Sequence, residues 1–344
     1  LKYDTEDGVI AWMQEIQRQV RSYISAYKIE LDMGVYVVEG DSIAIDMLCD
    51  RANISRAIAK KQNDEFYHFF KEKNRIDILS EQEIENAMEA AIQGKEFLVY
   101  LQPKIRLSSE SVAGGEALVR WDRPGKGLVP PNDFIPLFER NGFVRKLDLY
   151  MFDSVCAIME QWIKNNIGKH MVPISVNISR VHLSDAQLPQ RLLAIANRHN
   201  IPPNLLEIEL TESAVFLDGE SMMVMMQSIK DAGFLVSIDD FGSGYSSLSA
   251  LKDLPVDFVK IDKTFLDCAV NDTKGGKILE SIISMTKWLG LVTVAEGVET
   301  EEQCAFLRSA GCDLVQGYFY SRPVPVQEFE LLMQAEQIIG KTQA

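Results

Sequence analysis

The sequence has no long apolar run and few residues that bind soft metals. No segment approaches the roughly 20 consecutive apolar residues that a membrane-spanning helix needs, and no signal peptide is visible. Only four histidines are present, and none falls at H-x-x-x-H or H-E-x-x-H spacing, which disfavours a zinc hydrolase. The five cysteines are scattered without a C-x-x-C pair. This pattern predicts reduced thiols and a cytoplasmic location.

Positive charge is also scarce, with 35 Lys and Arg against 50 Asp and Glu and a net charge of −15. An acidic surface repels long nucleic acids, so a duplex-binding function is disfavoured. A small nucleotide stays possible, because bound metal ions can reverse the local field. The 344 residues suffice for one large domain plus a smaller piece. Because the chain begins in what reads as the middle of a domain, we expect a fragment whose membrane attachment, if any, lies upstream.

Residues 1–78 form one block with a partial α+β pattern. Apolar periodicity and turn residues predict a helix at Val9–Tyr23, a strand at Lys28–Val38, a helix at Ile43–Lys61 and a short segment at Glu65–Phe70. Residues 79–93 are expected to form a linker and first helix, with Ser80 as N-cap, Glu83 three residues later and Gly94 as the stop. Residues 94–337 are expected to form the main domain.

From residue 94 onwards, short β-rich runs alternate with amphipathic helices. The eight runs are Phe97–Ile105, Gly115–Trp121, Val172–Ile178, Leu205–Leu210, Leu235–Ile238, Phe258–Ile261, Leu291–Ala295 and Leu314–Tyr318. Eight such units predict an α/β fold, a TIM-type (βα)8 barrel, with a doubly wound open sheet as the alternative. The first two runs are closely spaced, so we expect an irregular start.

Polar and acidic residues gather at the carboxyl ends of these runs. They are Asn177, Glu209, Glu212, Asp239, Asp240, Lys260, Asp262, Glu296, Glu299 and Gln316. Each alone is typical of a helix cap, a turn or a surface charge. In a barrel, however, all these strand ends surround one mouth, the face that carries active sites.

Several carboxylates at one mouth repel one another unless a cation lies between them. The donor set consists of oxygens, which favours Mg²⁺, Mn²⁺ or Ca²⁺ over zinc or copper. Adjacent aspartates can bridge two ions, and two ions are the usual device for cleaving phosphodiesters. The Gly-rich stretch around Gly242 and Gly244 lacks a following Lys, so it is not a P-loop. We expect it to link the metal-binding aspartates to the next helix.

The motifs as a set resemble a known family. EALVRW at residues 116–121 follows Gln102-Pro103, and VNIS, ELTES, DDFGSGYSSL, VKID, AEGVET and QGYFYSRP come in the family order. Over about residues 80–335, the chain resembles the EAL-domain cyclic di-GMP phosphodiesterases of bacterial second-messenger signalling. The resemblance implies hydrolysis of cyclic di-GMP to linear pGpG with two Mg²⁺ or Mn²⁺ ions, and inhibition by Ca²⁺.

The resemblance also implies roles for individual residues. The metal ligands would be Glu116, Asn177, Glu209, Asp239, Asp240 and Glu296, with Asp239 bridging the two ions. The catalytic residues would be Lys260, which holds the attacking water, together with Asp239 and Glu296. The substrate contacts would be Gln102, Arg120, Asp262 and Pro323. Loop and supporting residues would be Glu212, Gly242, Ser243 and Gly244, with Glu299 and Gln316 near Lys260.

Two further expectations rest on resemblance. The family usually forms a homodimer next to the Gly-rich loop, which here suggests Ser246–Lys252 and Phe265–Lys274. The first block, through GVYVVEGDS and DRANISRAIAKKQNDEFYHFF, resembles the C-terminal part of a GGDEF (diguanylate cyclase) domain. The GG[DE]EF motif is absent from this chain, so we infer no cyclase activity for it.

Two alternatives belong to other classes. One is a catalytically silent receptor that binds cyclic di-GMP and passes a conformational change to the first block; the complete set of ligand-type residues argues against it. The other is an unrelated metal-dependent barrel enzyme, such as one that forms an enolate. It accounts for the carboxylates but not for EALVRW or DDFGSGYSSL.

Overall fold

The computed structural model describes residues 5–23, 29–38, 43–61, 65–167, 171–182, 185–217, 219–242, 251–335, 337–338 and 340. The chain divides into two compact units, Leu1–Glu89 and Ala90–Ala344. Helix α3 (Glu72–Gln93) contributes residues to both. Within the described residues, none of the helices combines the length and apolar character needed to span a bilayer.

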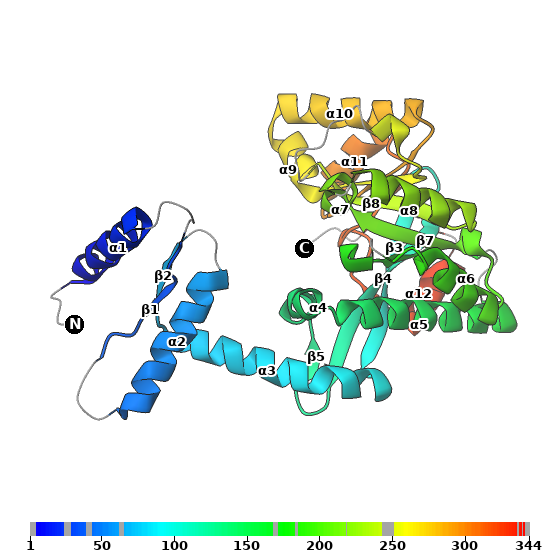
Figure 1. The fold of residues 1–344 in the computed structure, drawn as a ribbon. Helices are drawn as coiled ribbons and strands as arrows, with labels where there is room; N and C mark the ends of the chain where they lie inside the picture. Colours follow the sequence, from blue (N-terminus) through cyan, green and yellow to red (C-terminus); the bar gives the residue numbers. More distant parts are fainter. Residues whose placement is uncertain are drawn as a thin grey trace. The chain divides into compact units, whose positions relative to one another are not determined.

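The first unit pairs two helices with a small parallel sheet (Figure 1). Its elements are α1 (Glu6–Tyr23), β1 (Met33–Val35), α2 (Ile45–Lys61) and β2 (Tyr67–Phe69). Strand β1 packs closely against α2. A Cβ atom added to Gly34 would come within 1.9 Å of the Ala52 carbonyl oxygen, so only glycine fits there. The predicted order of elements is confirmed, but the regular part of the first strand covers only three residues.

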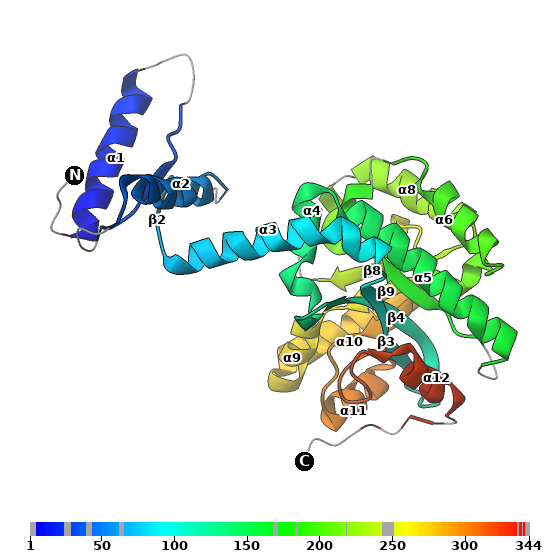
Figure 2. The same cartoon turned by 90° about the horizontal axis from the view of Figure 1, so that it is seen from below.

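The second unit is a closed barrel of eight strands (Figure 2). They are β3 (Phe97–Arg106), β4 (Ser111–Arg123), β6 (Ile174–Asn177), β7 (Leu206–Thr211), β8 (Leu235–Phe241), β9 (Phe258–Ile261), β10 (Val292–Ala295) and β11 (Leu314–Val315). Strand β3 runs antiparallel to both neighbours, β4 and β11, whereas the other pairings in the ring are parallel. The predicted TIM-type barrel with an irregular start is therefore confirmed, and closure of the sheet excludes the open alternative.

Short strands extend the barrel wall, and helices surround it. Strand β5 (Gly127–Val129) pairs with β4, and β12 (Val324–Pro325) pairs with β3. The helices are α4 (Ile135–Asn141), α5 (Val144–Asn165), α6 (Leu188–Arg198), α7 (Glu212–Leu217), α8 (Gly219–Asp231), α9 (Lys263–Asn271), α10 (Thr273–Trp288), α11 (Glu301–Ala310) and α12 (Val326–Gln334). Four 3-10 turns occur among the described residues: η1 (Pro131–Asp133), η2 (Arg180–His182), η3 (Pro203–Leu205) and η4 (Leu251–Asp253).

The expected start of the helix before the barrel is wrong. Helix α3 begins at Glu72, so Ser80 lies inside it and is not an N-cap. No Gly or Pro interrupts residues 72–93, and nothing therefore stops the helix from extending back past Ser80. Its end before Gly94 is confirmed. Residues 79–93, expected as a linker, are thus part of one continuous helix.

Candidate active site

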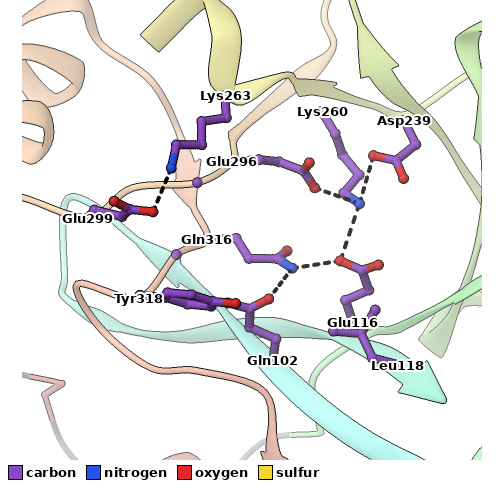
Figure 3. Close-up of a pocket in the computed structure, with 12 residues that line it drawn as sticks. Gln102, Glu116, Leu118, Asp239, Lys260, Lys263, Glu296, Glu299, Gln316 and Tyr318 are labelled. Carbon is purple, nitrogen blue, oxygen red and sulfur yellow. Dashed lines mark hydrogen bonds and ion pairs between the residues drawn. The ribbon is translucent and has the colours of Figure 1, made fainter. Parts of the chain in front are cut away.

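The ammonium group of Lys260 lies among four carboxylates at the mouth of the barrel, and Figure 3 draws three of them, Glu116, Asp239 and Glu296. Its Nζ is 2.7 Å from Glu296 Oε1, 2.9 Å from Asp239 Oδ1, 2.9 Å from Glu209 Oε2 and 3.3 Å from Glu116 Oε2. The side chain of Lys260 is only 1% exposed. Four acidic groups that are distant in sequence therefore share one buried cation.

Strand register explains this convergence. Side chains alternate across a strand, and the carboxyl ends of parallel strands meet at the same rim. Asn177 of β6 is in register with Glu209 of β7, and Glu116 of β4 with Gln102 of β3. The amide of Asn177 donates a hydrogen bond to Glu116 Oε1 at 2.9 Å. The predicted residues from four different strands thus come together.

Two glutamines support the other side of Glu116. Gln316 Nε2 donates to Glu116 Oε2 at 2.6 Å and to Gln102 Oε1 at 3.1 Å. Gln102 Nε2 donates in turn to the Ser321 carbonyl at 3.1 Å. The Oε1 atom of Gln316 is buried without a hydrogen-bond partner among the described residues. Gln316 therefore contacts Glu116 rather than Lys260, and it keeps one acceptor free.

A second buried lysine lies deeper in the barrel, and the sequence reasoning missed it. Lys104 Nζ is 2.9 Å and 3.0 Å from the two oxygens of Glu207, and 2.8 Å from Glu209 Oε1. Strand alternation could have revealed both residues. Lys104 lies two positions after Gln102, and Glu207 two positions before Glu209, so each pair shares one strand face.

Burial and neighbouring charges shift the pKa values of these groups in different directions. Burial raises the pKa of Glu296 to about 8, although Lys260 opposes the shift. Burial, and then the charge of Glu209, raise the pKa of Glu116. Burial opposes ionisation of Glu209, but Lys104 and Lys260 outweigh it and hold its pKa at about 2. The surroundings therefore favour the ionised form of Glu209 and disfavour the ionised form of Glu296.

Among the residues that the structure describes, two groups of three carboxylates could each hold a metal ion. One comprises Glu116, Glu209 and Asp239, and the other Asp239, Asp240 and Glu296; within each group the ligand oxygens lie within 4.8 Å of one another. Asp239 belongs to both. Asp240 adopts a left-handed backbone with φ of 54°, and burial together with the charge of Asp239 raises its pKa. Mutual repulsion of this kind is relieved by a cation.

A pocket of about 440 Å³ opens over these groups. Its lining includes Gln102, Glu116, Leu118, Asp239, Lys260, Lys263, Glu296, Gly297, Glu299, Gln316, Gly317 and Tyr318. Seven of the residues that the sequence singled out for this site therefore surround one pocket.

Three predicted substrate contacts lie outside this lining. Arg120 donates from Nη1 to the Val119 carbonyl at 2.8 Å. Asp262 caps α9 by accepting from the backbone N–H of Thr264 at 2.8 Å. Pro323 directly precedes β12. Their roles toward a substrate stay predictions.

The supporting residues are placed as follows. The backbone N–H of Gly242 donates to the carboxylate of Glu212, as expected for a loop anchor. Ser243 and Gly244 lie outside the described residues, as does most of the dimer segment Ser246–Lys252. Glu299 was expected near Lys260, but it forms its ion pair with Lys263, at 2.6 Å.

The chain belongs to the EAL domain family, whose model matches residues 85–323. It is 32% identical over 301 residues to the bifunctional diguanylate cyclase/cyclic di-GMP phosphodiesterase MucR of Pseudomonas aeruginosa, covering 88% of this chain and 44% of that protein. It is 31% identical over 303 residues to the cyclic di-GMP phosphodiesterase NbdA of the same organism, covering 88% of this chain and 38% of that protein. The chain thus spans less than half the length of these relatives.

A solved structure described as the PaMucR phosphodiesterase in complex with c-di-GMP is similar to this chain. The TM-score is 0.68 at 34% identity, and the match covers 72% of this chain and 99% of that one. The likeness therefore extends over most of this chain and nearly all of that one.

Proposed function

We propose that this chain hydrolyses cyclic di-GMP to linear pGpG in bacterial second-messenger signalling. The observation that carries the proposal is Asp239, which belongs to both groups of metal-ligand type and also contacts Lys260. Membership of the EAL family, with relatives named as cyclic di-GMP phosphodiesterases, supports the same reaction. An enolate-forming barrel enzyme has no such support.

The residues fit a pair of hard divalent cations. Six carboxylates (Glu116, Glu207, Glu209, Asp239, Asp240 and Glu296) lie around two ammonium groups (Lys104 and Lys260), which leaves a formal excess of four negative charges. Two divalent cations would neutralise that excess. Because the donors are oxygens, Mg²⁺ or Mn²⁺ suits the site better than zinc. Glu116, Asn177, Glu209 and Asp239 would hold the first ion, and Asp239, Asp240 and Glu296 the second.

When bound, the ions would lower the pKa of a water and stabilise negative charge on the phosphoryl oxygens. Lys260 would donate a hydrogen bond to the attacking water, with its position set by the surrounding carboxylates. Glu296 would accept a proton from that water. One bond forms between the water oxygen and phosphorus, and one bond from phosphorus to a ribose 3′ oxygen breaks. The leaving oxygen takes a proton, so the linear product carries a 5′ phosphate and a 3′ hydroxyl.

The remaining contacts would position the dinucleotide. Gln102 in the pocket would meet the reacting nucleotide. Arg120, Asp262 and Pro323 would contact parts of the substrate that extend beyond the pocket lining. Glu212 would hold the loop that begins at Gly242.

We also propose two features of the wider protein. The first unit would be the C-terminal part of a GGDEF-like domain without its catalytic motif, supported by its helix–strand–helix–strand order. A homodimer would form through the barrel domains at the segments Ser246–Lys252 and Phe265–Lys274, the second of which lies on α9 and the start of α10. The protein would act in the cytoplasm.

The test is incubation with cyclic di-GMP and Mg²⁺ or Mn²⁺, with pGpG quantified by chromatography. We expect turnover with either ion, inhibition by Ca²⁺, and less than a hundredth of the activity in Asp239→Asn, because that change removes a charge shared by both ions. Glu328→Gln on the exposed face of α12 is the control and should leave turnover unchanged. Absence of pGpG with every divalent ion would overturn the proposal. Tight nucleotide binding without cleavage would favour the receptor instead.

A further inference from the structure

Among the described residues that line the pocket, Lys260 and Lys263 are the cationic ones. The two lysines differ in how freely their ammonium groups can contact a ligand. Lys260 is 1% exposed and surrounded by four carboxylates, whereas the Lys263 side chain is 43% exposed. In the described part of the chain, Lys263 forms an ion pair with Glu299 at 2.6 Å, and Glu299 is itself 39% exposed. Figure 3 shows this pair on the side of the pocket away from Asp239.

Close packing against Gly297 sets the position of the Lys263 side chain at the rim of the pocket. Gly297 has a φ of +65°, and a Cβ atom there would lie 2.7 Å from Cβ, Cγ and Cδ of Lys263. The absence of a side chain at Gly297 therefore lets the lysine stem run along the backbone that follows β10. Because the stem packs against this backbone, the ammonium group is held at the pocket mouth with less freedom than an ordinary surface lysine.

Cyclic di-GMP carries two phosphodiester groups, each with one negative charge. The proposed reaction places one of them at the metal-binding carboxylates. We place the other beside it at the pocket, whose lining includes Glu116, Glu296 and Glu299, and there it needs a cation to offset their repulsion. Lys260 is already shared by four carboxylates.

From this placement, and resting on the proposed function, we infer that Lys263 binds the phosphate of cyclic di-GMP that is not cleaved. Glu299 pairs with Lys263 when no nucleotide is bound. When the nucleotide binds, the ammonium group leaves Glu299 and contacts the phosphate. Exposed pairs of this kind contribute little to stability, so the exchange costs little. A charged hydrogen bond to phosphate then forms in its place. Lys263 is thus a determinant of specificity for a substrate with two phosphates.

The test compares Lys263→Met with wild type on two substrates. For cyclic di-GMP, we expect KM to rise at least 10-fold while kcat changes less than 3-fold. Bis(p-nitrophenyl) phosphate has one phosphodiester, which must occupy the reacting position, so its kcat/KM should stay within 2-fold. Lys263→Arg keeps the charge and should retain most of the affinity. Lys277→Met, an exposed lysine on α10 outside the pocket lining, is the matched control.

Calorimetric binding of cyclic di-GMP with Ca²⁺ provides a readout that does not depend on turnover. There Lys263→Met should weaken binding at least 10-fold, while Lys277→Met should not. An unchanged dissociation constant and KM, or equal losses on both substrates, would overturn the inference and leave the proposed function standing. Wild type that binds the nucleotide but cleaves neither substrate would overturn the proposed function, and the binding comparison would still decide the role of Lys263. Wild type that does not bind the nucleotide would overturn both.

Discussion

Lys104 Nζ lies 2.8 Å from Glu209 Oε1, one of the two oxygens of a carboxylate that is predicted to bind metal. The other oxygen, Oε2, lies 2.9 Å from Lys260. The two oxygens of this carboxylate are therefore divided between two buried lysines. This division orients a predicted metal ligand through a residue that lines no part of the pocket.

Lys104→Met should destabilise the protein strongly. The change leaves Glu207 without its cation inside the barrel, and removing one partner of a buried ion pair costs about 3–5 kcal/mol. The measurement is urea unfolding of both proteins at neutral pH. Adding Glu207→Leu removes the stranded charge, so the double variant should recover a large part of the loss. A loss below about 1 kcal/mol in the single variant would contradict a structural role for this pair.

Lys260→Met should make stability depend more strongly on divalent cations. In metal-free buffer, Glu116, Glu209, Asp239 and Glu296 lose the cation that they share. Mn²⁺ can replace that charge, so the rise in Tm on adding Mn²⁺ should exceed that of wild type by about 2–4 °C, which corresponds to roughly 1 kcal/mol. Turnover should be lost. Thermal unfolding with EDTA or Mn²⁺ measures the effect, and an equal rise in both proteins would count against a charge role for Lys260.

Gly242→Ala should impair both folding and turnover. Gly242 has a φ of +96°, and an added Cβ would lie 1.9 Å from Cε2 of Phe265, so backbone strain and a steric clash combine. We expect a loss of about 2–3 kcal/mol and at least a 10-fold drop in kcat, because the bond from Gly242 to Glu212 shifts.

Gly125→Ala is the matched control for Gly242. Gly125 has a φ of +77° but nothing within 4 Å of an added Cβ, so it isolates the backbone strain, about 1 kcal/mol. Chemical unfolding and steady-state turnover should therefore separate the two glycines. Equal effects at both positions would show that the clash with Phe265 adds nothing to the loss of stability or turnover.

His199 should make stability fall as the pH rises. Its Nδ1 is 2.9 Å from Glu160 Oε2, and its Nε2 is 2.9 Å from Asp153 Oδ1. Burial alone would lower the pKa of His199, but the two carboxylates outweigh it and raise the pKa. The stabilisation is thus complete below the unfolded pKa of about 6.5 and is lost as the pH rises through the higher folded value.

His199→Gln tests this dependence. The variant should be less stable than wild type at pH 6, by no more than about 1 kcal/mol because the pair is near the surface. The difference should shrink toward pH 9. Urea unfolding at both pH values measures it. A difference that stays constant or grows with pH would show that His199 is held neutral in the folded protein.

Much of the barrel and its mouth could be predicted from the sequence. All eight strand runs are confirmed, because each is a short apolar segment whose end is marked by a polar residue or a turn. Asn177 and Glu209 lie near the carboxyl ends of such runs, and Asp239 directly follows another, so any closed parallel barrel brings them to one rim. The helix start at Ser80 was wrong because a capping pattern is local, whereas the preceding residues also favour helix.

The sequence by itself determined which oxygen-bearing side chains meet at the mouth, since strand periodicity and the order of the runs already specify their face. Only the tertiary structure decided which cation each carboxylate receives. Lys104, Glu207 and Lys263 read as isolated charges along the chain, and their partners come from other strands and loops. Pairing between buried charges depends on distances across the barrel, and those distances exist only once the sheet has closed.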